Sequence, residues 1–435
     1  MKNKSVYLII PNCTDLNRGD QALVWQSVSL SKELGFQGDY YVMSDSKDKS
    51  FQTLEKGLKI FFPILKHPSR FFKKNDNIQY NTLLKIKWGL IAIFDFFFSI
   101  TLLIKPLRFL VSKFLTKDLK NSLNLFEQSE KIFVKGGGFL HNDKKGIISF
   151  YYMYYMLYHI MLATSLKKEV IVYPNSFGPF NGYFTKKLAS TVLGKCKKIY
   201  SRESISRNIL EKELKIQSEL FPDLGFFLEK DNSFNSLEYI KKNNIPIRSK
   251  KCVAITVRPY RFQKSKEPKI LYEKYISCII KFSEYLNKNN FHPVFIEHTL
   301  AENEHENDST AINQIIQKLP NSTYSYIKDD NLNCEQIKAI YSNFYFIVGT
   351  RFHSVIFSLS EYVPAIAIAY GGNKAKGIMK DMNLSDYCLD IYQLNYKELV
   401  NSFQKAIKNR NEYINRIDEY MKFAHKKRKM IKGGF

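Results

Sequence analysis

Acidic residues are scarce in this chain relative to basic ones. Its 435 residues include 41 Asp and Glu against 66 Lys and Arg, which gives a formal net charge of +25 at pH 7. A surplus of this size indicates an anionic partner, such as substrate phosphates, an acidic membrane face or a nucleic acid. The basic residues are mostly lysines scattered along the chain, and no nucleic-acid-binding motif is recognisable. Nucleic acid is therefore the least favoured of the three partners.

Other patterns are also missing. The six cysteines, at positions 13, 196, 252, 278, 334 and 388, show no paired spacing that would predict a zinc site or a disulfide framework, and they fit a reducing cytoplasm. No cluster with metal-ligand spacing stands out, so we expect no required metal. The apolar run at 5–10 is too short for a secretory signal and is typical of a first strand. A chain of this length, without internal repeats, suits two domains.

One long apolar segment is present at 85–115. Residues 88–104 are almost continuously apolar and are interrupted by Asp95. The basic residues that flank this run are Lys85, Lys87, Lys105, Arg108 and Lys113. One acid near the middle and basic flanks favour a helix lying on an anionic membrane surface over a full crossing. The alternatives are a buried helix of the first domain and, least favoured, a transmembrane span.

Apolar runs alternate with helical patterns in both halves of the chain. The runs that predict strands lie at 5–10, 131–135, 170–173, 198–200, 252–257, 293–297, 322–327, 344–348 and 365–370. This alternation predicts two Rossmann-like α/β lobes with parallel sheets. We expect an N-terminal lobe at 1–230 that carries the 85–115 helical insertion, a linker region at 231–250, a C-terminal lobe at 251–394, and closing helices at 395–435.

The stretch 344–374 carries the clearest signal of a site. Its first predicted strand ends in a Gly-Thr turn, so Arg351 and His353 fall in the first turn of a helix. Backbone N–H groups and the positive end of the helix dipole favour an anion there. The next strand ends in GGNK, which brings Lys374 to the same rim of the sheet, where open α/β folds bind ligands. Taken singly, each residue is also typical of a surface cation or a packing side chain.

Strand ends elsewhere carry further candidates. Gly136, Gly137 and Gly138 follow the run at 131–135, and a glycine loop there would let backbone N–H groups approach an anion, although it lacks the spacing of a nucleotide-binding loop. Asp143 follows that loop, and a ligand contact is favoured for it over a helix cap.

The remaining candidates are polar residues after other predicted strands. They are Asn17 and Asp20 after the first strand, Arg202 and Asp223 in the first half, and Arg258 in the second. For Asp20, capping the next helix explains the residue as well as a ligand contact does. For Asp223, a helix cap or a loop hydrogen bond is an equal alternative.

Together these motifs resemble the polysaccharide pyruvyl transferase family. They are NRGDQA at 17–22, GGGFL at 136–140, SFGPF at 176–180, SRES at 201–204, PDLGF at 222–226, RFHS at 351–354 and YGGNK at 370–374. Their order and spacing match across almost the whole chain, with Phe352 standing where the family usually has Leu. The resemblance implies a GT-B-like architecture of two lobes with a cleft between them.

The resemblance also implies a reaction. Members of the family transfer the enolpyruvyl unit of phosphoenolpyruvate to two hydroxyls of a sugar, forming a cyclic ketal and releasing phosphate. The acceptor would belong to a cell-surface polysaccharide or its lipid-linked precursor. A lipid-linked acceptor would explain the apolar segment, so we expect a cytoplasmic protein associated with the inner face of the cytoplasmic membrane.

Roles for the candidate residues follow from this reaction. Phosphoenolpyruvate carries a carboxylate and a phosphate, so its binding requires several cations. The expected substrate-binding residues are Arg202, Arg258, Arg351, Lys374, Gly136, Gly137, Gly138, Asn17, Asp20 and Asp223. We expect His353 to act as general acid or base and Asp143, or alternatively Asp223, to activate or orient the acceptor hydroxyls. No cofactor is expected besides the donor substrate.

Two alternatives remain open. A glycosyltransferase of the same architecture would use Arg351 and Lys374 to neutralise the diphosphate of a nucleotide sugar, because fold does not decide chemistry. A non-catalytic basic protein of the membrane surface would bind lipid without an anionic small-molecule ligand, and the density of candidate site residues argues against it.

Overall fold

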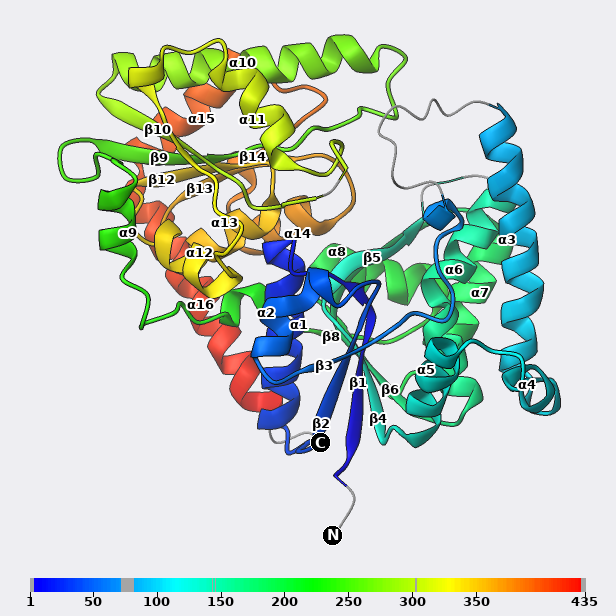
Figure 1. Ribbon diagram of the computed structural model, residues 1–435. Coiled ribbons are helices and arrows are strands. Elements are labelled where there is room, and N and C mark those ends of the chain that lie inside the picture. The colour runs from blue at the N-terminus through cyan, green and yellow to red at the C-terminus, as the bar shows by residue number, and fades with distance from the viewer. Residues whose placement is uncertain (1–3, 72–81, 143, 145, 302, 432–435) are drawn as a thin grey trace. The chain divides into compact units, whose positions relative to one another are not determined.

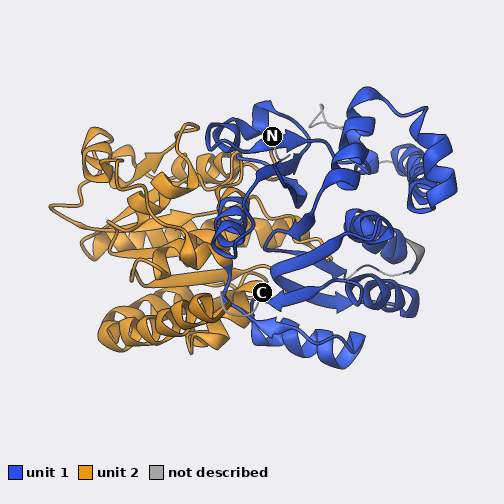
Figure 2. Ribbon diagram, turned by 90° about the horizontal axis from the view of Figure 1, so that it is seen from below, with its two compact units in different colours: residues 1–15, 23–223, 435 blue, residues 16–22, 224–434 orange. Residues whose placement is uncertain are grey.

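The computed structural model describes residues 4–71, 82–142, 144, 146–301 and 303–431 (Figure 1). The chain forms two compact units, which Figure 2 shows in different colours. The first comprises residues 1–15 and 23–223, and the second comprises residues 16–22 and 224–434. The short segment 16–22, which the sequence analysis placed in the N-terminal lobe, is thus grouped with the second unit. Helix α9 (Ser236–Lys242) occupies the middle of the stretch expected as a linker.

The first unit is built on a parallel sheet with the strand order β3-β2-β1-β4-β6-β7-β8, in which β5 pairs with β6. The strands are β1 (Val6–Cys13), β2 (Asp39–Ser44), β3 (Lys59–Phe61), β4 (Lys131–Val134), β5 (Gly137–Asn142), β6 (Glu169–Phe180), β7 (Lys198–Ser201) and β8 (Glu219–Leu220). Central residues such as Ile132, Val134 and Val172 are fully buried in the main apolar core. Helices cover both faces of such a sheet, which is why its strands are continuous apolar runs.

The helices of this part of the chain connect successive strands. They are α1 (Arg18–Glu33), whose first turn is grouped with the second unit, α2 (Phe51–Glu55), α3 (Thr82–Leu103), α4 (Lys105–Ser112), α5 (Lys117–Gln128), α6 (Gly146–Ser165), α7 (Tyr183–Leu193) and α8 (Ser204–Ile209). The 85–115 insertion is helical, as predicted, and forms α3 and α4. By length and composition α3 passes as a membrane span, with a mean hydropathy of 1.8, and only 17% of its apolar window is buried.

The second unit contains a six-stranded parallel sheet with the order β11-β10-β9-β12-β13-β14. Its strands are β9 (Lys251–Thr256), β10 (Phe291–Ile296), β11 (Ser325–Ile327), β12 (Phe346–Gly349), β13 (Ala365–Ala369) and β14 (Cys388–Asp390). The helices are α9, α10 (Pro268–Lys288), α11 (Asp308–Ile316), α12 (Cys334–Tyr341), α13 (Phe352–Leu359), α14 (Lys374–Asp381), α15 (Tyr396–Lys408) and α16 (Arg410–Ile431). The predicted class of two Rossmann-like α/β lobes is therefore confirmed.

Both sheets are doubly wound, with the first strand of each unit near the middle. In the second unit the chain moves outward from β9 through β10 to β11, then returns to the other side of β9 with β12. Ligands of open α/β sheets bind outside the carboxyl ends of the strands at this point of reversal. The ends of β9 and β12 are therefore the expected place for a site in this unit.

Two local predictions differ from the structure. Helix α1 begins at Arg18 rather than near residue 22, because the side-chain oxygen of Asn17 accepts hydrogen bonds from the backbone N–H groups of Gly19 and Asp20, at 3.0 and 3.3 Å. An Asn in this position satisfies donors of the first turn that otherwise lack partners. The glycine segment expected as a loop belongs in large part to β5, which pairs with β6 through Gly137 and Asn175.

Candidate functional site

Three predicted cations lie where β9, β12 and β13 end. Gly349 of β12 is in register with Thr256 of β9, so the segments that follow the two strands start side by side. Arg258 follows β9, Arg351 follows β12, and Lys374 follows β13 as the first residue of α14. The predicted strand-end positions of these three residues are confirmed, and the structure brings them to one edge of the second unit's sheet.

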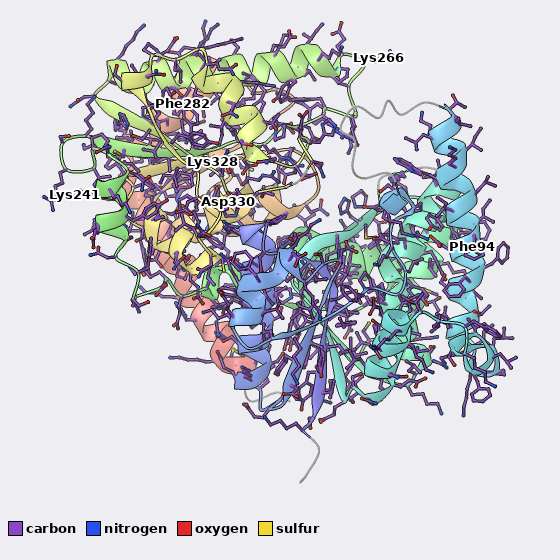
Figure 3. All side chains as sticks on the ribbon, viewed as in Figure 1. Phe94, Lys241, Lys266, Phe282, Lys328 and Asp330 are labelled. Carbon is purple, nitrogen blue, oxygen red and sulfur yellow. The ribbon has the colours of Figure 1, made fainter. Side chains whose placement is uncertain are left out.

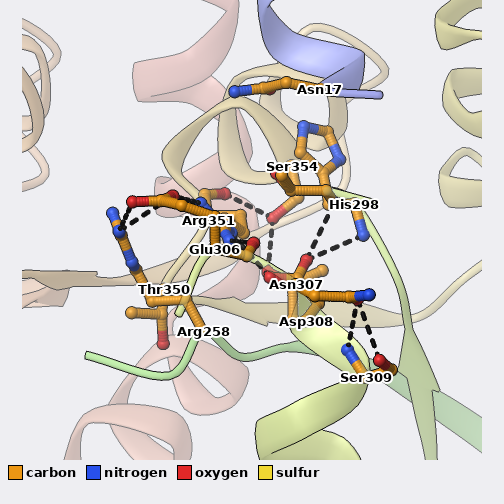
Figure 4. Close-up of polar contacts among 12 residues, drawn as sticks. Asn17, Arg258, His298, Glu306, Asn307, Asp308, Ser309, Thr350, Arg351 and Ser354 are labelled. Atoms are coloured by element: carbon orange, nitrogen blue, oxygen red, sulfur yellow. Dashed lines mark hydrogen bonds and ion pairs between the residues drawn. The ribbon is translucent and has the colours of Figure 1, made fainter. Parts of the chain in front are cut away.

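Arg351 is held by a buried carboxylate. Its Nε lies 2.7 Å from Oδ1 of Asp308, and the side chains of the two residues are 7% and 0% exposed. The other oxygen of Asp308 accepts hydrogen bonds from the backbone N–H groups of His298 and Thr299, each at 2.9 Å (Figure 4). Burial raises the pKa of Asp308, and the charge of Arg351 opposes that rise. Arg351 is thus fixed in place by an acid that the sequence analysis did not select.

Arg258 is linked to Arg351 through Glu306. One guanidinium nitrogen of Arg258 lies 3.2 Å from both carboxylate oxygens of Glu306, and Nη1 of Arg351 lies 3.6 Å from the same carboxylate (Figure 4). The guanidinium of Arg258 also stacks 4.5 Å from the ring centre of Tyr370. Glu306 is half exposed. A carboxylate that bridges two arginines at the surface of a sheet edge can be displaced by an anionic ligand with the same geometry.

His298 is a buried histidine that the sequence analysis missed. It is 1% exposed, its Nδ1 lies 3.2 Å from the hydroxyl of Tyr341, and its Nε2 has no hydrogen-bond partner among the described residues. Burial lowers the pKa of His298 well below its usual value, and the nearby charges of Arg351, Arg18 and Lys374 lower it further. His298 follows β10, so the strand-end rule that selected Arg258 would also have found it.

His353 lies against the start of α1. A Cβ placed on Gly19 would lie 1.9 Å from Nδ1 of His353, so only glycine fits there. Nζ of Lys374 lies 3.1 Å from Nε2 of His353 and 3.3 Å from Nδ1. An ammonium can only donate, so a ring nitrogen that bonds to it must be the unprotonated one. His353 is 9% exposed, which leaves little of its ring open to water.

The segment 16–22 completes this cluster. Asn17 forms an isolated antiparallel bridge with Thr299, and the backbone N–H of Arg18 donates to the carbonyl of His298 at 3.2 Å. The buried guanidinium of Arg18 donates to the carbonyl oxygens of Asp329 and Asp330. Asn17 and Asp20 are therefore close to the predicted site residues of the same unit, although Asn17 acts as a helix cap. Substrate contact by either stays a prediction.

The second unit thus gathers four cations and two histidines around two acids. The cations are Arg18, Arg258, Arg351 and Lys374, the histidines are His298 and His353, and the acids are Asp308 and Glu306. One acid is buried and committed to Arg351, so the surplus of positive charge remains in the cluster. Such an arrangement can bind a small dianion or trianion, and His353 lies within it as a group that can give or take a proton.

In the first unit, Arg202 and Asp223 bind each other. Nη1 of Arg202 lies 2.8 Å from Oδ2 of Asp223, and both side chains are 0% exposed. Nε of Arg202 donates to the hydroxyl of Ser176 at 2.7 Å, whereas Nη2 has no partner within the described ranges. The structure therefore gives both residues an internal partner that the sequence did not reveal. Substrate binding by Arg202 or Asp223 stays a prediction.

The glycine triplet makes room for that arginine. A Cβ on Gly138 would lie 2.6 Å from Nη2 of Arg202, and a Cβ on Gly137 would lie 3.0 Å from the ring of Phe139. The expectation of an open glycine loop was wrong, because Gly137 and Gly138 belong to β5, where their missing side chains permit close packing. Anion binding by Gly136, Gly137 or Gly138 remains untested. Asp143, the predicted partner of the acceptor, lies outside the described residues.

Comparison with known proteins gives one family. A family model described as polysaccharide pyruvyl transferase matches residues 17–372. Among curated proteins, the amylovoran biosynthesis protein AmsJ of Erwinia amylovora is 22% identical over 282 residues. That alignment covers 60% of this chain and 66% of the relative, so the chain spans just under two thirds of AmsJ.

Solved structures with a similar fold have much lower identity. MnaA of S. aureus, solved with UDP, has a TM-score of 0.55 and 12% identity, covering 95% of this chain and 90% of its own. Anabaena HepE, solved with UDP and glucose, has a TM-score of 0.51 and 8% identity, covering 98% and 95%. At these identities the likeness shows the fold alone, and that fold is the GT-B-like pair of α/β domains that was predicted.

Proposed function

Because this chain belongs to the polysaccharide pyruvyl transferase family, we propose that it transfers the enolpyruvyl group of phosphoenolpyruvate to two hydroxyls of a sugar. The products are a pyruvate ketal and inorganic phosphate. The family and the AmsJ relative support the coarser statement, a transferase of polysaccharide biosynthesis. The donor and the ketal chemistry are the proposal.

The observation that carries the proposal is the cation cluster of the second unit. Phosphoenolpyruvate has a carboxylate and a phosphate on adjacent parts of a small molecule, so it requires several cations within a few ångströms of each other. Arg351 and Arg258 already share the carboxylate of Glu306. A substrate carboxylate or phosphate replaces Glu306 in our proposal, and Lys374 and Arg18 supply further positive charge.

The chemistry needs one acid and one base. The methylene carbon of phosphoenolpyruvate takes a proton from the acid while the first sugar hydroxyl adds to the neighbouring carbon and loses its own proton to the base. The second hydroxyl then attacks that carbon, the bond to the phosphate oxygen breaks, and phosphate leaves with the bonding electrons and takes up the proton that the second hydroxyl loses. We assign the general acid or base to His353, one of whose ring nitrogens is unprotonated where it accepts from Lys374.

Two features of the arrangement serve this role. The fit of Gly19 against the imidazole fixes the orientation of the His353 ring, which general acid–base catalysis requires. The Asp308 carboxylate fixes Arg351 through Nε and leaves the outer face of its guanidinium toward the exposed Glu306. Asp143 stays in the proposal as the residue that orients the acceptor hydroxyls. No cofactor enters these steps, because the substrate itself carries the leaving group.

We also propose a location and an acceptor class. The acceptor is a sugar of a cell-surface polysaccharide or of its lipid-linked precursor, and the enzyme works at the inner face of the cytoplasmic membrane. The net charge of +25 supports attraction to an anionic surface. The exposure of the apolar helix α3 supports contact with the membrane.

The experiment that tests the donor is a thermal-shift titration with phosphoenolpyruvate and with a panel of nucleotide sugars. A ligand that binds only the folded state raises its stability, by about 2.7 kcal/mol at 100 times Kd. We expect phosphoenolpyruvate to raise the melting temperature of the native chain. The Lys374→Met variant should lose most of this rise, because Lys374 lies in the cation cluster beside His353.

Lys376→Met is the matched control. Lys376 lies on the same helix, is half exposed and pairs with Asp390 at 2.6 Å. Its response to phosphoenolpyruvate should equal that of the native chain. A response to a nucleotide sugar alone would replace the proposal with the glycosyltransferase alternative. An equal response of Lys374→Met and Lys376→Met to phosphoenolpyruvate would remove Lys374 from the donor site.

A further inference from the structure

Helix α3 buries an acid and a hydroxyl, whereas many of its large apolar residues are exposed. Its buried residues are Leu84, Asp95, Ser99 and Leu102. Asp95 forms a two-pronged ion pair with Arg70, at 2.5 and 2.8 Å, and the hydroxyl of Ser99 lies 2.7 Å from that of Tyr154 on α6. In an ordinary surface helix of a globular protein the polar face is the exposed one. In α3, Asp95, the acid that interrupts the apolar run, is buried and its charge is balanced by Arg70.

The opposite side of α3 is an apolar stripe that faces away from the rest of the first unit. Its members recur at intervals of three or four residues, as one face of a helix requires. The most exposed are Leu83, Ile86, Leu90, Ile93, Phe94 and Phe97, at 55–69%. Figure 3 shows the labelled Phe94 pointing away from the helices that α3 packs against. A stripe of this kind marks an interaction surface.

Helix α4 and the residues after it continue this pattern. Arg108 is the buried residue of α4, at 6% exposure, whereas Phe109, Leu110 and Phe114 are 66%, 54% and 89% exposed. Again the charged side chain lies inward and the apolar side chains lie outward. We call the exposed apolar residues of α3, α4 and Phe114 the α3–α4 face.

The exposed charges within residues 82–117 have one sign. The exposed ionisable side chains between residues 82 and 117 are Lys85, Lys87, Lys105, Lys113 and Lys117. Asp95, the one acid in that range, is buried in its pair with Arg70. Apolar side chains bordered by lysines are the pattern of a helix that lies in the interface of an anionic bilayer.

An open groove of about 690 Å³ adjoins the α3–α4 face. Its apolar lining includes Phe62, Phe94, Phe98, Phe114 and Leu119, and its charged lining residues are Lys66, Arg70, Asp45, Asp95 and Asp118. The exposed rings of Phe94 and Phe114 therefore border a hollow rather than a flat patch. Lipid chains conform to such an uneven surface, whereas a rigid protein partner would need a matching ridge.

We propose that the α3–α4 face docks the protein on an anionic lipid bilayer, with α3 lying along the interface rather than crossing it. A crossing would break the Arg70–Asp95 and Ser99–Tyr154 contacts and leave Asp95 in hydrocarbon. The lysine border contacts lipid headgroups and the aromatic stripe enters the acyl region. This deepens the proposed function by identifying the surface that holds the enzyme near a lipid-linked acceptor, but it does not depend on the donor being phosphoenolpyruvate.

The test is co-sedimentation of the full chain with vesicles of phosphatidylcholine, with and without 30 mol% phosphatidylglycerol. We expect binding to the anionic vesicles that weakens as salt is added. The triple variant Phe94→Glu/Phe97→Glu/Phe114→Glu should bind at least about tenfold more weakly, since it removes apolar side chains and adds negative charge. All three side chains are well exposed, so the variant should fold.

Two controls make the result specific. Leu237→Glu changes a leucine of α9 that is 56% exposed in the second unit, and it should leave vesicle binding unchanged. Lys105→Glu/Lys113→Glu should weaken binding to anionic vesicles only, whereas Lys241→Glu/Lys242→Glu on α9 should not. Equal vesicle binding by the native chain and the triple variant would overturn the proposal.

Light scattering without lipid tests whether the α3–α4 face binds a second copy of the chain instead of a bilayer. If the native chain self-associates and the triple variant is monomeric, with no vesicle binding by either, the face is an interface between copies and the proposal fails. The phosphoenolpyruvate thermal shift of the triple variant should match the native one. A native chain that binds vesicles but shows no such shift would contradict the donor proposal and leave the docking surface intact.

Discussion

Two acids, one buried and one half exposed, hold the guanidinium of Arg351 in the candidate site. Asp308 accepts from Arg351 and from two consecutive backbone N–H groups, so its carboxylate is fully used. Glu306 meets the same arginine from the solvent side and is half exposed. One acid is therefore a buried support and the other is open to solvent, a difference that residue type alone does not reveal.

This difference predicts unequal effects of two similar substitutions. Asp308→Asn leaves Arg351 beside a neutral group in a buried position, and breaking a buried pair costs about 3–5 kcal/mol. We expect the lower end of that range, because the amide oxygen can still accept from the backbone. Glu306→Gln should cost less than about 1 kcal/mol, as exposed pairs do. Urea unfolding measures both, and equal losses would contradict the assignment.

Gly19 provides a second prediction at the scale of single residues. A methyl group there would lie 1.9 Å from Nδ1 of His353, so Gly19→Ala must displace the imidazole. Overpacking of this kind costs about 1–3 kcal/mol. The cost should shrink when His353→Ala is added, giving a coupling energy of at least about 1 kcal/mol in a double-mutant cycle by urea unfolding. Strictly additive effects would mean that the two residues do not touch.

At the scale of elements, β5 shows why the glycines at 136–138 stand together. Gly138→Ala should destabilise the chain by about 1–3 kcal/mol, because its Cβ would meet a guanidinium that Asp223 and Ser176 hold in place. Gly89→Ala is the matched control, since nothing lies within 4 Å of a Cβ at that position in α3. The control should be neutral or slightly stabilising. Chemical denaturation of both variants measures the change in the free energy of unfolding. No change for Gly138→Ala would contradict close packing in β5.

The same element marks the limit of reading structure from sequence. The strands were predictable because a buried parallel strand is a continuous apolar run, and β9, β10, β12 and β13 all appear as such runs. The strand-end rule then located Arg258, Arg351 and Lys374. The rule is local, however, and the packing of Arg202 against Gly138 joins residues from different elements. A glycine run that makes room for a side chain has the same sequence as one that binds an anion.

Helix α3 shows a second such limit. Its composition predicted a helix and suggested a membrane surface, but a hydropathy pattern does not show which way Asp95 points. In the structure Asp95 points inward and pairs with Arg70, which lies 25 residues earlier in the chain. Asp308 was missed for the same reason, because its partner Arg351 lies 43 residues further on and neither residue's local pattern indicates the pair.

At the scale of the whole molecule, buried histidines couple stability to pH in both units. His159 in the first unit accepts a hydrogen bond from the backbone N–H of Ile64 at 3.1 Å, and burial lowers its pKa from 6.5 to about 3. In the second unit, burial and then the charge of Lys250 lower the pKa of His292 to about 4. Both histidines stay neutral in the folded chain at pH values where the unfolded chain protonates them.

The sign of the effect follows from proton linkage. Between pH 6.5 and the folded pKa the unfolded chain binds more protons, so stability is retained above pH 6.5 and lost as the pH falls. Each such histidine removes at most about 1.4 kcal/mol of stability per pH unit.

His159→Gln keeps a side-chain acceptor but cannot titrate, so we expect its free energy of unfolding in urea to fall less steeply between pH 7 and 5 than that of the native chain. His425→Gln, which changes an exposed histidine on α16, should follow the native slope. Parallel slopes for the native chain and His159→Gln would show that His159 does not contribute to the acid sensitivity.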